Sequence, residues 1–270
     1  MVAARRRDRD GGRALSELAL YALLALGGVG AGFVNTVAGG GSLLTVPVLI
    51  LLGMPATVAN GTNRLAVVTQ TLSGVVAFKR AGKLHTAAIP SVAIPTTIGA
   101  ALGAVGAAYA PEWLLKPVLL GTMAGVALLV LLKPDFLKGP KDGEDVPPPL
   151  SLRERPAAWL GLLFAGTYGG FAQAGVGFVL LYVLGAMLRY DAARANALKL
   201  TIVLVYGVVV LGIFVAAGQV EWIPAAILAT STVLGSQLGV RFALRADGRW
   251  IRGLVFVATV ASCVGAYFKD

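Results

Sequence analysis

The chain has 270 residues, of which 57% are hydrophobic and only 13% charged, and it carries a formal net charge of +10. Soluble domains carry about 25% charged residues. Because the charges here also cluster between long apolar runs, the composition excludes an ordinary soluble domain and predicts a polytopic membrane protein. The single Cys and single His exclude an internal disulfide and a metal site built from several such ligands. The excess of Lys and Arg fits loops that face anionic lipid, and we expect no nucleic-acid partner.

The chain begins with a basic tail, residues 1–13, followed by an apolar run from 15 to 38. This arrangement is similar to a signal peptide. The apolar run is longer than the usual core of about 7–15 residues, however, and further apolar runs follow it. We therefore expect a first helix that is retained.

Two halves, residues 14–132 and 157–270, flank a polar linker, residues 133–156, which contains three consecutive prolines. The predicted apolar segments of the first half are 15–38, 43–52, 65–78, 87–109 and 114–132. Those of the second half are 157–174, 176–188, 200–217, 223–240 and 251–268. The segment 43–52 is too short to span a bilayer at about 1.5 Å per residue, and its mate 176–188 is also short.

The two halves resemble each other at a fixed offset of 136 residues. This offset pairs Gly39 with Gly175, Gly41 with Gly177, Asn60 with Asn196, Gly99 with Gly235 and Gly103 with Gly239. Upstream, a slip of two residues pairs Gly32 with Gly170 and Asn35 with Gln173. Internal repeats of this kind are typical of secondary transporters.

Loop charges predict that the repeats are inverted. Lys79, Arg80 and Lys83 lie in one loop, and the equivalent loop of the second half, 217–222, has no Lys or Arg. Conversely, four arginines lie between 241 and 252 in the second half, and the equivalent loop of the first half has only Lys116. The positive-inside rule places such mates on opposite faces, so each half crosses the membrane an odd number of times. Five spans per half satisfy this, and so does a re-entrant hairpin plus three spans. Both leave the basic tail outside, against the same rule.

Glycines interrupt the apolar pattern once in each half. Gly39, Gly40, Gly41 and Ser42 follow Asn35, and Gly175 and Gly177 follow Gln173. A glycine-rich turn at the start of a helix exposes backbone N–H groups, to which the helix dipole adds partial positive charge, so it suits an anion. Close packing between membrane helices is the alternative explanation for the same glycines.

Polar residues at the expected start of the next span are the second candidate. Asn60, Thr62, Asn63 and Arg64 precede one apolar run, and Asn196 and Lys199 precede its mate. Charge at membrane depth is costly and usually functional, so we expect Lys199, more than Arg64, to face a substrate. Helix capping by the amides and snorkelling by the cations are the alternatives.

Other chemistry has no candidate in the sequence. No carboxylate lies deep in an apolar run, and neither paired carboxylates nor a Ser-His-Asp set is present. We therefore expect no enzyme, no catalytic residue, no metal and no cofactor.

Several motifs are similar to those of one family. They are the glycine run 39–41, Gly53-Met54-Pro55, Ala59-Asn60-Gly61-Thr62-Asn63 and Ser73-Gly74. With these motifs the chain resembles the sulfite exporter TauE/SafE family, also described as DUF81-like membrane anion permeases, over about residues 25–268. The second half departs from the pattern, since Asn196-Ala197-Leu198-Lys199 stands where the first half has Gly-Thr-Asn. The resemblance implies a bacterial inner-membrane transporter of small anions, sulfite or organosulfonates, with export as the expected direction.

Together the sequence predicts an all-α polytopic membrane protein of two inverted repeats, each with a broken or re-entrant helix pair plus three transmembrane helices. The predicted function is secondary transport of a small anion across the cytoplasmic membrane. The predicted substrate-binding residues are Asn35, Gly39, Gly40, Gly41, Ser42, Asn60, Thr62, Asn63, Gln173, Gly175, Gly177, Asn196 and Lys199. An anion channel and a non-transporting membrane scaffold are the alternatives, and a homodimer is an open alternative to a monomer.

Overall fold

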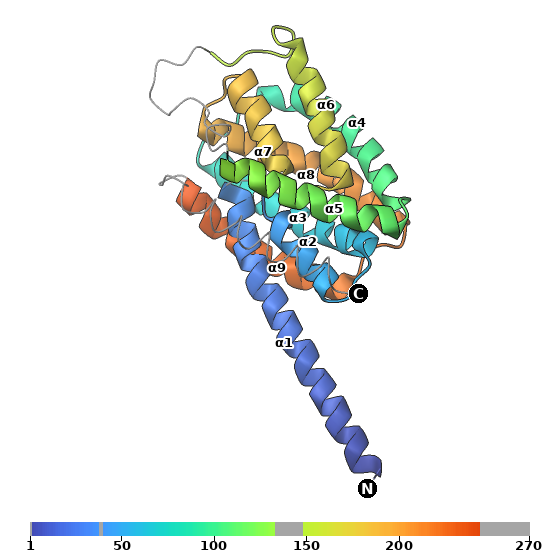
Figure 1. The fold of residues 1–270 in the computed structure, drawn as a ribbon. Helices are drawn as coiled ribbons and strands as arrows, with labels where there is room; N and C mark the ends of the chain where they lie inside the picture. The colour runs from blue at the N-terminus through green and yellow to red at the C-terminus, as the bar shows by residue number, and fades with distance from the viewer. Residues whose placement is uncertain (1, 38–39, 133–147, 244–270) are drawn as a thin grey trace.

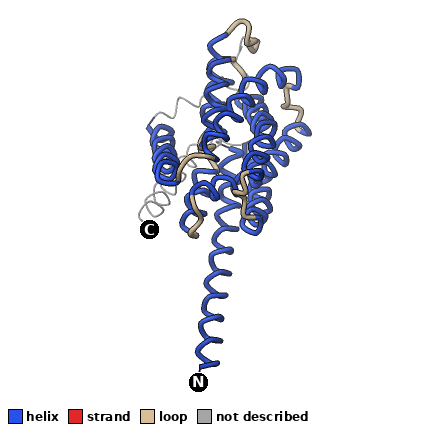
Figure 2. The backbone as a smooth tube through the Cα atoms, turned by 90° about the vertical axis from the view of Figure 1, so that its right-hand side faces the viewer, coloured by secondary structure: helices blue, strands red, loops and turns tan. Residues whose placement is uncertain are grey.

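The computed structural model describes residues 2–37, 40–132 and 148–243, and these are helical nearly throughout (Figures 1 and 2). The first half contains α1 (Val2–Val37), α2 (Ser42–Leu51), α3 (Ala56–Arg80), the short 3₁₀ turn η1 (Thr86–Ala88), α4 (Ile89–Ala108) and α5 (Glu112–Leu132). The second half contains α6 (Pro156–Phe171), α7 (Val176–Leu181), the π-helical turn η3 (Tyr182–Met187), α8 (Ala192–Ala216) and α9 (Trp222–Ala243). The predicted segment 251–268 lies outside the described residues. No strand occurs in the described ranges, so the all-α prediction is confirmed for them.

Within the described residues, four helical stretches are long and apolar enough to cross a membrane: Leu20–Val37, Thr86–Ala108, Ala192–Ala216 and Trp222–Phe242. Two shorter apolar helical stretches, Ser42–Leu51 and Val176–Met187, occupy the predicted broken positions. At about 1.5 Å per residue neither spans the roughly 30 Å of a bilayer core.

The loops gather at two opposite ends of the molecule. At one end the linker is held by a hydrogen bond from Leu150 N to Leu188 O of 3.0 Å, and His85 meets Tyr190 at 3.3 Å. At the other end Gln219 Nε2 donates to Ala108 O at 2.7 Å. Helix α1 projects beyond the bundle at this second end, away from the linker (Figure 1).

This grouping matches the predicted topology in one respect. The loops after Arg80 and at Arg153 share the linker end, and the loops at Pro111 and Gln219 share the opposite end. Arg245 lies outside the described residues. Which end faces the cytoplasm stays a prediction.

Glycines let two pairs of parallel helices pack backbone to backbone. A methyl group on Gly32 of α1 would lie 2.1 Å from Thr232 O of α9, and one on Gly235 would lie 1.9 Å from Val29 O. In the second pair, α4 and α6, a methyl group on Gly170 would lie 1.9 Å from Ala100 O. Such distances are far below van der Waals contact, so only glycine permits these approaches. Both pairs join a helix of the first half to a helix of the second.

Helices α3 and α8 cross the centre of the molecule in opposite directions. The start of α3 meets the end of α8, where Gly61 approaches the ring of Phe214 and the backbone of Gln219. Near its end, Gly74 approaches Leu200 at the start of α8. By contrast α3 runs parallel to α9, since Thr232 and Ser236 donate to Ala66 O and Gln70 O.

The structure corrects one prediction about the helix breaks. Residues 60–64 were expected to interrupt the chain before a span beginning at 65, yet they lie inside α3, which starts at Ala56. The same holds in the second half, where Asn196 and Lys199 lie inside α8. Their side chains bond to other helices, which leaves the helical backbone intact. The breaks that remain are those between α1 and α2 and between α6 and α7.

Candidate functional site

Arg64 lies at the centre of a polar cluster where α6 ends. Its side chain is buried, with 1% exposed. Its Nη1 donates to Gly169 O at 2.7 Å and to Gln173 Oε1, and its Nη2 donates to Gly170 O at 2.6 Å and to Asn60 Oδ1 at 3.0 Å. Asn60 Nδ2 in turn donates to Phe171 O at 2.8 Å. We call this set the α6-end cluster: Asn60, Arg64, Gln173 and the carbonyl groups of residues 169–171.

The second cluster has the same plan where α1 ends. Lys199 is also only 1% exposed, and its Nζ donates to Asn35 O at 3.2 Å. Asn196 Nδ2 donates to Thr36 O at 2.9 Å. We call this set the α1-end cluster: Asn35, Thr36, Asn196 and Lys199. In both clusters a cation and an asparagine from a long helix satisfy the last carbonyl groups of a helix that stops inside the protein.

The physical reason for this plan is the polarity of a helix end. The last carbonyl groups of a helix lack intrahelical partners and carry partial negative charge, so donors and cations stabilise them. These bonds also exclude snorkelling, because Arg64 and Lys199 point inward and are covered. Among the described residues no carboxylate forms an ion pair with either cation. Arg64 instead contacts the ring of Phe214, with Cζ 5.2 Å from its centroid.

The start of α2 forms a third polar group beside these clusters. Asn63 Nδ2 donates to Ser42 Oγ at 3.0 Å, and Asn63 Oδ1 accepts from Thr45 Oγ1 at 2.6 Å. A methyl group on Gly41 would lie 2.3 Å from Ala31 O, which shows close packing between α1 and α2. Gly40 has looser surroundings: its added methyl group would meet side-chain atoms of Leu43 and Phe178 at 3.1 Å. The break before α2 therefore lies next to the start of α7.

The remaining predicted residues have separate positions. Gly175 adopts a left-handed conformation, φ +77°, just before α7, a geometry that favours glycine. Gly177 is buried within α7. Thr62 Oγ1 accepts from Glu221 N at 3.0 Å and so holds the loop between α8 and α9. Gly39 lies outside the described residues.

The two cations and their asparagines come from two antiparallel helices. Asn60 and Arg64 are near the start of α3, Asn196 and Lys199 are near the start of α8, and the two helices are antiparallel. Arg64 and Lys199 are therefore about 11 residues apart along the pair, roughly 17 Å at 1.5 Å per residue. The arrangement is two clusters, one toward each end of the molecule.

Arg64 was ranked below Lys199 from the sequence, although its hydrogen-bond network is the larger one. The signal available was a cation that follows Gly-Thr-Asn in an apolar context. The sequence alone placed it near a membrane surface because it counted those polar residues as a loop. Tyr206, which lies in α8 close to this cluster, was not selected at all.

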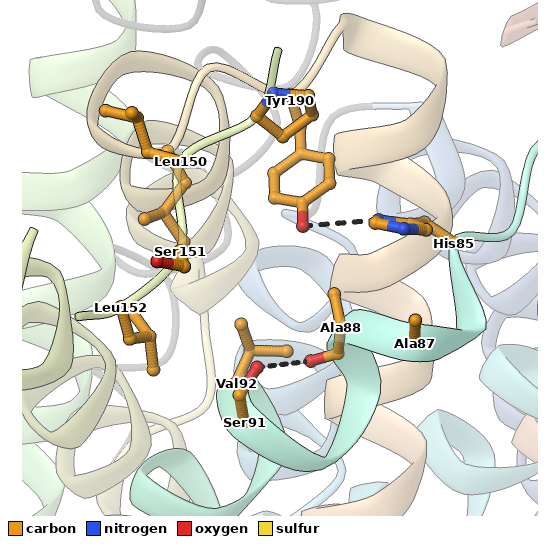
Figure 3. A pocket seen from close by; sticks show the side chains of 11 residues that line it. His85, Ala87, Ala88, Ser91, Val92, Leu150, Ser151, Leu152 and Tyr190 are labelled. Atoms are coloured by element: carbon orange, nitrogen blue, oxygen red, sulfur yellow. Dashed lines mark hydrogen bonds between the residues drawn. The ribbon is translucent and has the colours of Figure 1, made fainter. Parts of the chain in front are cut away.

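A separate pocket of about 230 Å³ lies at the linker end (Figure 3). Its lining joins both halves, with His85 and Val92 from the first half, Leu150 and Leu152 from the linker, and Tyr190 from the second half. Partial burial raises the pKa of Tyr190. Beside the pocket, hydrogen bonds from Ser151 lower the pKa of Glu154. No residue predicted to bind substrate lines this pocket.

An all-helical chain with membrane-length apolar helices, two interrupted helices and buried cations at the interruptions has the features of a polytopic membrane transporter. The chain belongs to the sulfite exporter TauE/SafE family, whose model matches residues 24–266. It is therefore a membrane transporter protein, as the resemblance predicted.

Three relatives agree with this assignment. The chain is 25% identical over 245 residues to the "Probable membrane transporter protein ORF9" of Sinorhizobium sp, covering 91% of each chain. It is 27% identical over 243 residues to a "Probable membrane transporter protein" of Haemophilus influenzae, covering 88% of this chain and 91% of that one. It is 25% identical over 236 residues to the "Probable membrane transporter protein YfcA" of Escherichia coli K12, covering 85% and 82%. No solved structure matches the chain.

Proposed function

We propose that this transporter carries a small anion, such as sulfite or an organosulfonate, and that Arg64 and Lys199 supply its attraction. The observation that carries the proposal is the uncompensated charge of these two side chains. Each is 1% exposed and bonded only to neutral oxygen atoms, and no described carboxylate pairs with either. Burying a cation without a counter-charge is expensive, so the resting site favours entry of an anion.

The predicted binding residues fit this proposal as two sets. Asn60 and Gln173 belong with Arg64, and Asn35 and Asn196 belong with Lys199. The start of α2 lies next to both sets, since Ser42 bonds to Asn63, the neighbour of Arg64, and Gly41 packs against Asn35. Gly40 belongs to the same turn, and the turn at Gly175 opens α7. An anion that crosses the molecule passes from one cluster to the other, so both cations act on the same ion in succession.

Helix directions support an inverted repeat. Helices α1, α3 and α9 run one way, and α4, α6 and α8 run the other. Exchanging each helix with its sequence mate, α1 with α6, α3 with α8 and α4 with α9, converts the first set into the second. The close glycine contacts follow the same exchange: the contact of Gly32 in α1 with α9 corresponds to the contact of Gly170 in α6 with α4. Such repeats support alternating access about a central site.

The moving parts then differ from the two sequence halves. Rocking of one half against the other is the simplest form of alternating access, but α1 is packed on α9 and α4 on α6 through backbone contacts. Because these contacts tolerate no added methyl group, each pair moves as one body. The proposed motion is therefore between composite units, each of which contains helices of both halves. The helix ends at the two clusters are where the contacts between these units change.

The proposal also includes the location and direction of transport. The protein is a multi-pass protein of the bacterial cytoplasmic membrane, contacts lipid, and exports its anion without catalysis. The test is anion flux in proteoliposomes with sulfite, sulfate and sulfoacetate, against a neutral control. We expect saturable flux and exchange between labelled and unlabelled anion for a carrier. Flux that rises linearly with concentration indicates a channel, and absence of flux for every anion indicates a scaffold and contradicts the proposal. The oligomeric state follows from the mass of the purified particle.

A further inference from the structure

Two buried polar groups near the α6-end cluster lack any hydrogen-bond partner. One is Arg64 Nε in α3 and the other is the hydroxyl of Tyr206 in α8. Both side chains are fully enclosed, with 1% and 0% exposed. Orphaned buried groups of this kind are rare in folded proteins and destabilise them, so each one needs an explanation.

The side chains that carry these two groups both approach the same residue, Gly169. Arg64 Nη1 donates to Gly169 O at 2.7 Å, and a methyl group on Gly169 would lie 2.9 Å from the Tyr206 hydroxyl oxygen. Arg64 and Tyr206 are also close enough to interact electrostatically. The absence of a side chain at residue 169 is thus what lets the hydroxyl approach the end of α6.

The charge of this location selects among ligands. Four of the five guanidinium N–H groups are engaged by neutral oxygen atoms, which hold Arg64 in place without cancelling its charge. The remaining Nε–H and the Tyr206 O–H are both donors. A pair of donors with one net positive charge complements an oxyanion that carries one negative charge. A doubly charged anion would leave one charge buried without compensation.

We infer that Arg64 Nε–H and the Tyr206 hydroxyl form an oxyanion subsite at the end of α6, selective for singly charged anions of the sulfonate type. This inference rests on the proposed function, since it names the binding groups and the charge class of the transported anion. In the structure the subsite is closed around Gly169, and it opens when the end of α6 separates from α8. Lys199 belongs to the α1-end cluster, where its Nζ donates to Asn35 O.

The test uses the full chain in proteoliposomes with methanesulfonate as the singly charged probe and sulfate as the doubly charged one. Tyr206→Phe removes only the hydroxyl and keeps the buried ring. Loss of one hydrogen bond to a charged ligand predicts an apparent KM for methanesulfonate at least tenfold higher. Tyr109→Phe, at an exposed position at the end of α4, is the matched control and is expected to keep the parent KM.

A binding readout separates this subsite from a purely structural role. Methanesulfonate should raise the unfolding temperature of the detergent-solubilised parent but not of Tyr206→Phe. Without ligand, Tyr206→Phe should unfold at the same temperature as the parent or higher, because it removes an orphaned buried hydroxyl. A lower temperature without ligand would show that the hydroxyl has a structural partner, and would overturn the inference.

Two further results decide between the inference and the function on which it rests. If the parent transports methanesulfonate, and Tyr206→Phe does so with an unchanged KM, the subsite is wrong while anion transport stands. Equal inhibition of methanesulfonate flux by sulfate and by unlabelled methanesulfonate would refute the charge selectivity. If the parent moves none of the anions, the proposed function itself fails.

Discussion

Replacing Lys199 by Gln tests whether the buried ammonium group contacts the transported anion. Lys199 is 1% exposed, and its Nζ makes one described hydrogen bond, to Asn35 O at 3.2 Å. A glutamine amide retains donors of similar polarity but has no charge. Because only one bond is at stake, we expect Lys199→Gln to fold and insert like the parent, so that a change in flux reports on the charge.

The structure separates two magnitudes for this variant. Direct contact between an ammonium group and an anion contributes about 1.5–3 kcal/mol, which predicts a rise in apparent KM of roughly ten- to a hundredfold. If the anion instead binds only at Arg64, whose backbone is roughly 17 Å from that of Lys199 along the helix pair, a Coulomb attraction over that distance is about 1 kcal/mol at an effective dielectric constant near 20. Its loss then raises the KM only about fivefold.

The assay is initial-rate anion uptake into proteoliposomes over a range of concentrations, normalised to the amount of inserted protein. We expect a rise in KM well above tenfold for Lys199→Gln and partial recovery in Lys199→Arg, since a planar guanidinium does not occupy the space of a compact ammonium. A parent-like KM in Lys199→Gln refutes the role of the charge. A fivefold rise refutes direct contact and leaves Arg64 as the binding cation.

Three further predictions test other parts of the structure. On a Cys263→Ser background, single cysteines at Arg80 and Arg153 should label from the cytoplasmic side and those at Pro111 and Gln219 from outside; labelling of positions 80 and 219 from one side would contradict the inverted topology. Gly40→Val should abolish flux in a protein that still inserts and folds, because its added atoms meet only side chains. Gly32→Val should instead reduce the amount of folded protein, because its methyl group would lie 2.1 Å from Thr232 O. Equal losses in both would assign Gly40 to packing. Glu112→Ala removes the carboxylate that accepts hydrogen bonds from Ala56 N and Thr57 N at the start of α3. By comparison with helix N-caps, this loss should destabilise the protein by about 0.5–2 kcal/mol in thermal unfolding. An unchanged unfolding temperature would show that water replaces the carboxylate.

The helical segments were predictable because apolar length is the strongest signal in a membrane sequence. Helices α2, α4 and α9 begin and end within two or three residues of their predicted bounds. The exceptions are the starts of α1, α3 and α8. Asn60, Asn63 and Arg64 were interpreted as a loop because polar side chains in an apolar chain usually mark a surface, whereas here each bonds to another helix.

Several of the predicted site residues belong to the two clusters, but the arrangement of the clusters was not predictable. Asn60 and Asn196 were predicted as repeat mates, and in the structure each binds the end of an interrupted helix. The two asparagines are separated because each lies near the start of its helix and α3 and α8 run in opposite directions. Local sequence does not encode helix direction. Tyr206 gave no signal, because one tyrosine in an apolar helix has the same appearance whether its hydroxyl is bonded or free.

The pairing of α1 with α9 has a consequence for how the protein is made. Helix α1 is synthesised long before α9, and its glycine face, which includes Gly28 and Gly32, has no backbone to pack against until α9 enters the membrane. Helix α4 waits in the same way for α6. The nascent first half is therefore an open intermediate, whose small-residue surfaces are available to lipid, to insertion factors or to another copy. A chain stopped after α8 already contains the partner of α4 and should leave only the glycine face of α1 open, so its degradation in cells would be governed by the absence of one late helix.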